Sequence, residues 1–320
     1  MLSAAADLDL PEEGARCKAS LQAFTQRVIG GLGLREHEAD WLHKHDASID
    51  DGNIYLRFPF CFREAFPAVR LEDLRVLALS GILWMSYMRA QDNSIDRPEC
   101  NYPTLLFLRD LYLRESLHLL YALFSHDSVF WRYYRTYYGE YALSVLSEAT
   151  DHSTIESAYN AEEFHRIARG KAAMAKYPIA AQAVLSGHDG ALHLLIESLD
   201  CFHIGYQYWD DVVDWKQDVA NSKYSFLLSK ALRAAPSEAR VLPSDELRRK
   251  IAHAVYYGGL ADEQLDQASN WLERAYELGA AAGCTRWAAH VKSLQSRTIV
   301  LRTDLRSIAL KQRSSGAAGR

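Results

Sequence analysis

Apolar residues recur every three or four positions along almost the whole chain, which is the period of an α-helix with one buried face. The sequence lacks the alternating runs and tight hairpin turns that are typical of β-strands. The eight prolines fall mostly between the periodic segments. The pattern therefore predicts an all-α fold. The expected helices cover residues 15–32, 35–44, 71–93, 103–125, 128–150, 161–185, 190–219, 224–233, 244–257, 261–282 and 285–311.

The segments between these helices give no clean domain boundary. Residues 47–67 combine Gly52, Pro59 and several aromatic residues, so we expect an ordered connection there. Residues 234–243 are expected to form a loop, and the Ser/Gly/Ala-rich residues 314–320 a disordered tail. The sequence thus predicts one domain over residues 1–313, a helical bundle around a central cavity.

Composition and charge exclude several classes of protein. The formal net charge is only -5 over 320 residues, which gives no electrostatic footprint for nucleic acid. The five cysteines are scattered and without CxxC spacing, so we expect no disulfide framework, no zinc knuckle and a cytoplasmic location. Neither a signal peptide nor an apolar run of about 20 residues is found, so no membrane span is expected.

The first candidate site ends the helix expected over residues 71–93. Asp92 and Asp96 are four residues apart, which puts both carboxylates on one helical face. Pro98 keeps the residue before it out of helical geometry, so the helix should end there and leave Asp96 at a cavity rim. An ordinary solvated face is the alternative, with Asp92 paired to Arg89.

The second candidate site, residues 207–218, is richer in acids. Asp210, Asp214 and Asp218 share a helical face, interleaved with tryptophan and valine. Like charges at this spacing repel, and an unpaired buried acid is costly, so the pattern predicts a bound cation. The ligands are oxygen atoms without histidine or thiolate, which favours magnesium over zinc. Pairing of Asp214 with Lys216 or Lys223 is the alternative.

These motifs resemble those of the class I isoprenoid synthase superfamily, which includes prenyl diphosphate synthases, squalene and phytoene synthases, and class I terpene cyclases. Residues 207–214 are similar to the second aspartate-rich motif of prenyl diphosphate synthases, in which a glutamine precedes DDxxD at the same spacing. Residues 89–96 resemble the first motif, with Asn93 at its second acidic position and Arg89 as in squalene and phytoene synthases. The resemblance covers residues 71–227.

The resemblance implies a magnesium-dependent enzyme, with about three ions, that acts on a prenyl diphosphate and is compatible with a homodimer. Lys171 stands where prenyl synthases carry a diphosphate-binding lysine, although Ala172 replaces the threonine that follows it, and Lys176 is the second choice. Tyr87 and Met88 are expected to set the depth of the pocket. The implied metal ligands are Asp92, Asp96, Asp210, Asp211, Asp214 and Asp218, of which Asp92, Asp96, Asp210 and Asp214 would be catalytic. The implied substrate contacts are Arg89, Lys171, Lys176, Gln207, Lys223, Tyr224, Trp84, Tyr87, Met88 and Tyr206.

Departures from the family motifs bear on the reaction. Chain-elongating synthases carry an arginine pair shortly after the first motif, whereas Asn101 and Tyr102 stand here. A second diphosphate site is therefore doubtful, and the sequence favours a terpene cyclase that ionises farnesyl or geranylgeranyl diphosphate. The alternatives are a prenyltransferase that condenses two prenyl diphosphates and a non-catalytic partner subunit. The sequence determines neither the substrate's chain length nor the product skeleton.

Two further features are expected to shape the helices. Pro178 lies inside the helix expected over residues 161–185 and should break it locally. Arg297, Arg302 and Arg306 are expected to line the polar face of the last helix.

Overall fold

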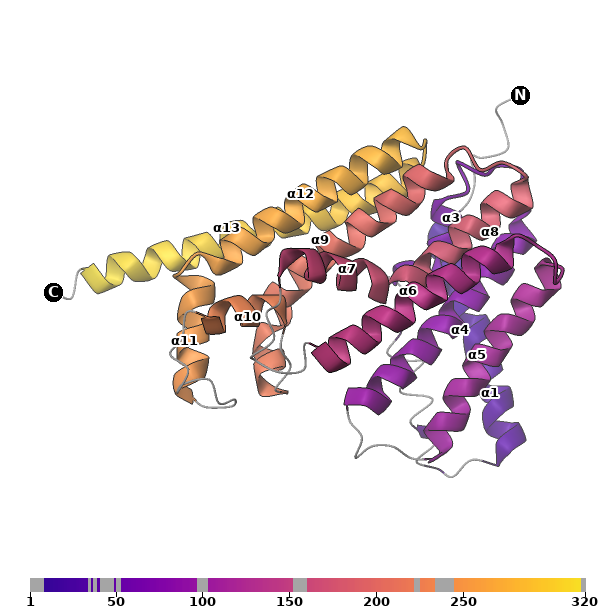
Figure 1. The fold of residues 1–320 in the computed structure, drawn as a ribbon, viewed down its shortest axis with the longest axis horizontal. Helices are drawn as coiled ribbons and strands as arrows, with labels where there is room; N and C mark the ends of the chain where they lie inside the picture. The colour runs from indigo at the N-terminus through magenta and orange to yellow at the C-terminus, as the bar shows by residue number, and fades with distance from the viewer. Residues whose placement is uncertain are drawn as a thin grey trace. The chain divides into compact units, whose positions relative to one another are not determined.

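The computed structural model describes residues 9–33, 36, 39–40, 49, 53–96, 103–151, 160–221, 225–233 and 245–317, with backbone alone for 93, 95–96, 103–105, 151 and 308–317. These residues form twelve α-helices and two 3-10 helices, and no strand is found among them. The predicted all-α fold is confirmed (Figure 1).

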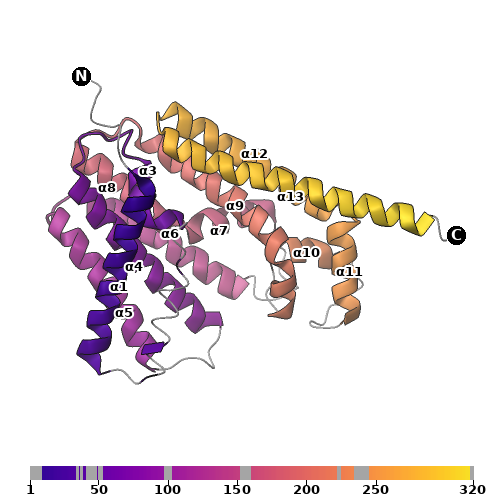
Figure 2. The same cartoon turned by 180° about the vertical axis from the view of Figure 1, so that it is seen from behind.

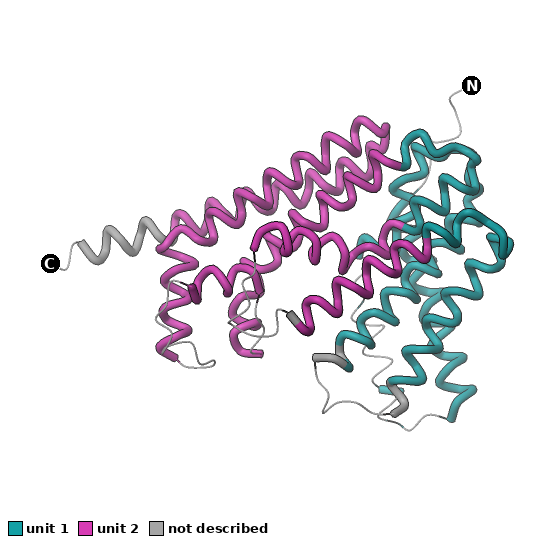
Figure 3. Tube along the Cα trace, viewed as in Figure 1, with its two compact units in different colours: residues 1–133, 177–192 teal, residues 134–176, 193–320 magenta. Residues whose placement is uncertain are grey.

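The chain divides into two compact units, residues 1–133 with 177–192 and residues 134–176 with 193–320 (Figure 3). The elements of unit 1 are α1 (Leu10–Leu32), η1 (Ile54–Leu56), α3 (Phe58–Cys61), α4 (Leu71–Asp96), α5 (Pro103–Leu123), the start of α6 (Phe130–Asp151) and α8 (Tyr177–Ser186). Those of unit 2 are the rest of α6, α7 (Ala161–Lys171), η3 (Ala173–Lys176), α9 (Leu192–Ala220), α10 (Phe226–Arg233), α11 (Asp245–Tyr256), α12 (Leu260–Ala281) and α13 (Thr285–Ala317). The single domain stays a prediction.

Unit 1 is held together by packing of α4 against α5 and by a buried hydroxyl network. Ser80 Oγ lies 2.9 Å from Ser116 Oγ and 3.0 Å from Tyr177 Oη, so α4, α5 and α8 share hydrogen bonds in a dry core. Arg75 donates to both carboxylate oxygens of Glu13, at 2.9 and 2.7 Å, which joins α4 to α1. These contacts fix α4, the helix that carries the first acidic motif.

Unit 2 contains α9, the helix of the second acidic motif, with α12 and α13 running side by side (Figure 1 and Figure 2). Gly205 allows close contact between α9 and α12, because a Cβ there would lie 2.9 Å from Leu272 Cγ and 3.0 Å from the Ala268 carbonyl oxygen. A cluster of buried apolar side chains joins α9 to α10, α11 and α12. Substitution of Gly205 by a larger residue would force α9 and α12 apart.

Local signals explain where α7 and α8 begin. Asn160 and Glu163 form a capping box that starts α7, with their reciprocal hydrogen bonds at 2.9 and 3.2 Å. The break expected near Pro178 is present as η3, between α7 and α8. Pro178 is the second residue of α8, where its missing N–H costs nothing, so it begins a helix instead of kinking one.

The structure departs from the expected boundaries at the C-terminus. Helix α13 continues to Ala317 and so includes the first residues of the expected disordered tail. The helix expected over residues 35–44 falls largely outside the described residues. Across the helices that are described, none combines the length and the apolar character that a membrane crossing requires.

Candidate functional site

The acidic face of α9 brings Asp210 and Asp214 together, one helical turn apart. Asp210 is half-buried and Asp214 is exposed, and the Tyr206 hydroxyl donates a hydrogen bond to Asp210. Among the described residues, no cationic side chain lies within ion-pair distance of either carboxylate. The two acids therefore lie near each other without an ion-pair partner in the part of the chain that the structure describes.

The electrostatics of Asp210 reflect this lack of a partner. Burial, and then the nearby Asp214 carboxylate, raise the pKa of Asp210 to about 6. The hydrogen bond from Tyr206 and the positive charge of Lys171 oppose the rise without cancelling it. A bound cation would relieve the repulsion between the Asp210 and Asp214 carboxylates, so the surroundings of Asp210 favour the binding of a metal ion.

Asp211, the next residue of α9, has different surroundings. Its side chain is 3% exposed, and both oxygens accept hydrogen bonds, Oδ1 from Gln207 Nε2 at 2.9 Å and Oδ2 from the Leu227 N–H at 3.2 Å. Burial raises the pKa of Asp211 to about 7, and the two hydrogen bonds oppose that rise. The sequence predicts a metal-binding Asp211 and a substrate-binding Gln207, whereas the structure bonds these two side chains to each other.

Lys171 lies at the end of α7, close to α6. Its Nζ lies 2.7 Å from Glu148 Oε2, and its side chain is still 37% exposed. Gly170 brings α7 this close to α6, because a Cβ at this position would overlap Ser144 Oγ. Lys171 thus remains accessible to an anion and contributes positive charge to the surroundings of Asp210.

Lys176 is placed differently from its predicted role. Its side chain is 4% exposed, and Nζ lies 2.9 Å from Glu140 Oε2 and 2.8 Å from Asp200 Oδ1, with the Tyr137 ring 5.7 Å away. Burial raises the pKa of Asp200, and the Lys176 charge opposes this. These contacts hold Lys176 in a buried ion cluster, and its predicted contact with the substrate stays a prediction.

The predicted aromatic contacts divide into buried and accessible groups. Trp84 and Tyr87 are buried in unit 1 and pack edge to face, with ring centroids 5.1 Å apart. Tyr206 is 39% exposed beside Asp210. The sequence did not single out Trp209 and Arg297 as a pair, yet the Arg297 guanidinium lies 5.7 Å from the Trp209 ring. This pair places a C-terminal arginine next to the acidic motif.

The first acidic motif lies at the end of α4 in unit 1. Asp92 is exposed, Met88 and Arg89 are half-buried, and Asp96 is the last residue of the helix, with its side chain outside the described atoms. Because Asp92 and Asp210 belong to different units, their convergence on shared cations stays a prediction.

The residues after the second motif complete the account of the predicted site. Asp218, two turns beyond Asp210, is half-buried. Lys223 and Tyr224 lie outside the described residues, so their predicted contacts with the substrate stay predictions.

The carboxylates of α9 fit a magnesium ion. No group of three or more histidine, cysteine, aspartate or glutamate side chains converges as a metal cage within the described part of the chain. Magnesium commonly keeps several waters and is bound by one or two carboxylates together with substrate phosphates. The Asp210–Asp214 pair, which has no ion-pair partner among the described residues, supplies the one or two carboxylates that this mode of binding requires.

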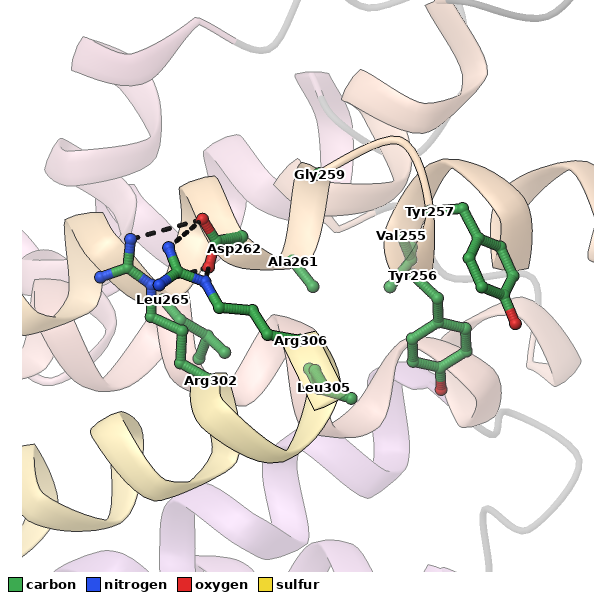
Figure 4. A pocket seen from close by; sticks show the side chains of 10 residues that line it. All are labelled: Val255, Tyr256, Tyr257, Gly259, Ala261, Asp262, Leu265, Arg302, Leu305 and Arg306. Carbon is green, nitrogen blue, oxygen red and sulfur yellow. Dashed lines mark hydrogen bonds and ion pairs between the residues drawn. The ribbon is translucent and has the colours of Figure 1, made fainter. Parts of the chain in front are cut away.

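A pocket of about 370 Å³ lies elsewhere in unit 2 and contains none of the predicted site residues. It is lined by Val255, Tyr256, Tyr257, Gly259, Ala261, Asp262, Leu265, Arg302, Leu305 and Arg306. Figure 4 shows the guanidinium groups of Arg302 and Arg306 directed at the Asp262 carboxylate. Two of the three arginines that the sequence assigns to the polar face of the last helix are thus paired with an acid of α12.

The arrangement of the helices is the fold of several solved prenyl diphosphate synthases. Heptaprenyl diphosphate synthase from Staphylococcus aureus has a similar structure, with a TM-score of 0.74 over 92% of this chain and 100% of that chain, at 14% identity. Geranylgeranyl pyrophosphate synthase from Corynebacterium glutamicum, complexed with isoprenyl diphosphate and magnesium, gives 0.67 over 91% and 99%, at 17% identity.

A third solved structure, polyprenyl synthase from Caulobacter crescentus complexed with calcium and isoprenyl diphosphate, gives a TM-score of 0.67 over 90% of this chain and 97% of that chain, at 15% identity. No protein-family model and no curated protein matches the sequence. At these identities the comparisons establish the fold, and they confirm the resemblance at that level.

Proposed function

We propose that this chain is a magnesium-dependent isoprenyl diphosphate synthase, a prenyltransferase that joins an allylic prenyl diphosphate to a second prenyl unit. The observation that carries the proposal is the Asp210–Asp214 pair, which lies on α9 without a cationic partner among the described residues. Two solved structures of the same fold hold isoprenyl diphosphate together with magnesium or calcium. The pair is suited to the same kind of ligand.

The side chains around α9 divide the work. Asp210 and Asp214 would hold the metal, which when bound neutralises the diphosphate and makes it a better leaving group. Lys171, accessible at the end of α7, would donate hydrogen bonds to the diphosphate oxygens. Tyr206 holds the Asp210 carboxylate in place through its hydroxyl.

The fold comparisons support transfer over cyclisation. The similar solved structures are synthases of prenyl diphosphates, which favours the transferase alternative over the cyclase that the sequence favours. Cyclisation of a single prenyl diphosphate is the second candidate, because Asn101 and Tyr102 stand where elongating synthases carry arginines. The two reactions share the ionisation step and differ in the acceptor of the allylic carbon.

One set of incubations tests the proposal. The purified chain is given farnesyl or geranylgeranyl diphosphate with magnesium, first alone and then with isopentenyl diphosphate, and the products are identified by mass spectrometry. Longer diphosphates in the second incubation support transfer, whereas a cyclic hydrocarbon or alcohol in the first replaces it with cyclisation. A chain that releases no diphosphate in either incubation would be a non-catalytic subunit, and the proposal would be wrong.

A further inference from the structure

Asp210 and Asp211 are neighbours in sequence with opposite environments. Successive residues of an α-helix point about 100° apart, so adjacent side chains meet different surroundings. Asp210 lies on the accessible face with Tyr206 and Asp214, whereas Asp211 lies on the face of Tyr208 and Trp215, which are buried. One half of the DD pair is thus available to a ligand and the other half is enclosed by protein.

The oxygens of Asp211 join α9 to α10. Oδ2 accepts the Leu227 N–H at 3.2 Å, and Ser225 Oγ accepts the Leu228 N–H at 3.4 Å. The first turn of a helix has N–H groups without partners in the helix, so these two acceptors cap α10. Asp211 reaches α10 from a position 16 residues earlier in the chain. Its negative charge also faces the positive end of the α10 dipole.

Packing around this cap makes it a fixed point. Leu227 and Leu228 are fully buried and belong to one apolar cluster with Val212 and Trp215 of α9. The apolar cluster holds α9 and α10 together through contact area. The Asp211 hydrogen bonds fix the relative orientation of the two helices, because a hydrogen bond is lost when its donor rotates away from the acceptor. Rotation of α9 that would turn Asp210 and Asp214 away from the accessible face is therefore opposed at the residue next to Asp210.

We infer that Asp211 is a positioning residue of the acidic motif and not a ligand of its metal. It holds α9 in the orientation that presents Asp210 and Asp214, by capping α10 and accepting from Gln207. The inference rests on the proposed function only for its effect on catalysis. The link between α9 and α10 can be tested without any turnover.

The experiment compares three substitutions in the full-length chain. Asp211→Leu removes both acceptors and keeps the branched shape of the side chain. Asp211→Asn keeps an oxygen for the Leu227 N–H and presents an N–H to Gln207, whose amide can turn to accept it. Asp210→Asn alters the proposed metal ligand itself. Ser225→Ala is the matched control, because it removes the other cap of α10 without altering α9.

Two measurements separate positioning from metal binding. Hydrogen exchange of the Leu227 amide should be faster in Asp211→Leu and close to wild type in Asp211→Asn, while Ser225→Ala should affect Leu228. The kcat/KM should fall roughly 10- to 100-fold in Asp211→Leu, which is the usual loss for a residue that orients a metal ligand. The Asp211→Asn variant should keep most of the wild-type kcat/KM. The magnesium concentration for half-maximal rate should rise in Asp210→Asn and stay near wild type in Asp211→Asn.

Two results would overturn the inference. A magnesium requirement that rises in Asp211→Asn as much as in Asp210→Asn would make Asp211 a ligand. Unchanged exchange at Leu227 in Asp211→Leu would remove the link to α10. If Asp211→Leu does not fold, Asp211→Ser takes its place, since the shorter side chain cannot reach both donors. A wild-type chain without turnover would reject the proposed function, and the exchange data would still decide the role of Asp211.

Discussion

Two aspartate pairs of unit 2 have the same spacing and opposite surroundings. Asp210 and Asp214 on α9 lie four residues apart without a neutralising cation among the described residues, and burial raises the pKa of Asp210 to about 6. Asp262 and Asp266 on α12 have the same separation, yet Arg302 donates to both of them, at 2.8 and 2.6 Å. Hydrogen bonds from Arg306 and Arg302 hold the pKa of Asp262 far below its usual range.

The difference shows that spacing alone does not identify a metal site. Acids whose charge is matched by arginines stabilise the fold, as Asp262 joins α12 to α13. Acids that are partly buried beside a like charge cost stability, so their presence is consistent with the proposed metal ligand.

The largest expected effect is on catalysis. Asp210→Ala should abolish magnesium-dependent diphosphate release, because it removes half of the carboxylate pair. The thermal unfolding midpoint should not fall, since the substitution also removes a half-buried charge that lacks a cationic partner among the described residues. Asp266→Ala is the control, because it makes the same substitution at an aspartate that pairs with Arg302, and its turnover should stay at the wild-type level. Diphosphate release and circular dichroism check both variants, and persistent turnover in Asp210→Ala would remove the metal assignment.

The next effect is on stability and concerns the two lysines. Lys176→Met should cost roughly 3–5 kcal/mol of unfolding free energy, because it leaves Asp200 and Glu140 without their buried partner. Lys171→Met breaks a half-exposed pair and should cost less than about 1 kcal/mol. Its KM for the diphosphate substrate should rise instead. Denaturant unfolding and steady-state kinetics distinguish the two, and equal stability losses would contradict the assignment.

The two aspartate pairs should also give opposite pH dependences in metal-free buffer. A raised pKa, as at Asp210, stabilises the fold below the unfolded value of about 4, and this contribution is lost as pH rises through about 6. The lowered pKa of Asp262 stabilises above about pH 4, and that contribution is lost on acidification. Each slope is at most about 1.4 kcal/mol per pH unit.

Chemical denaturation from about pH 3 to about pH 8 tests these signs. The stability of Asp210→Asn relative to wild type should rise between about pH 4 and about pH 7, because only the wild type loses a proton there. The deficit of Asp262→Asn should shrink below about pH 4. A flat difference for Asp210→Asn would mean that its pKa is ordinary.

Features that depend only on nearby residues could be predicted from the sequence. Helical periodicity gave the all-α fold, and the spacing of Asp210 and Asp214 predicted their shared face. The role of Lys176 could not be predicted, because its partner Glu140 is 36 residues away and follows no local rule. The same holds for Asp211, whose partner Leu227 starts another helix. Long-range pairing, which only the fold creates, separates structural charges from functional ones.

The smallest expected effect tests the structural pair directly. In Asp262→Ala, Arg302 still donates to Asp266, whereas Arg306 loses the Asp262 carboxylate to which it donates. The loss should be about 1 kcal/mol, because the carboxylate is partly exposed and water screens the pair. Raising the salt to about 1 M should reduce the difference from wild type, since the Debye length then falls to about 3 Å. Magnesium-dependent turnover should persist; its loss would show that the arginine-paired acids also serve the reaction.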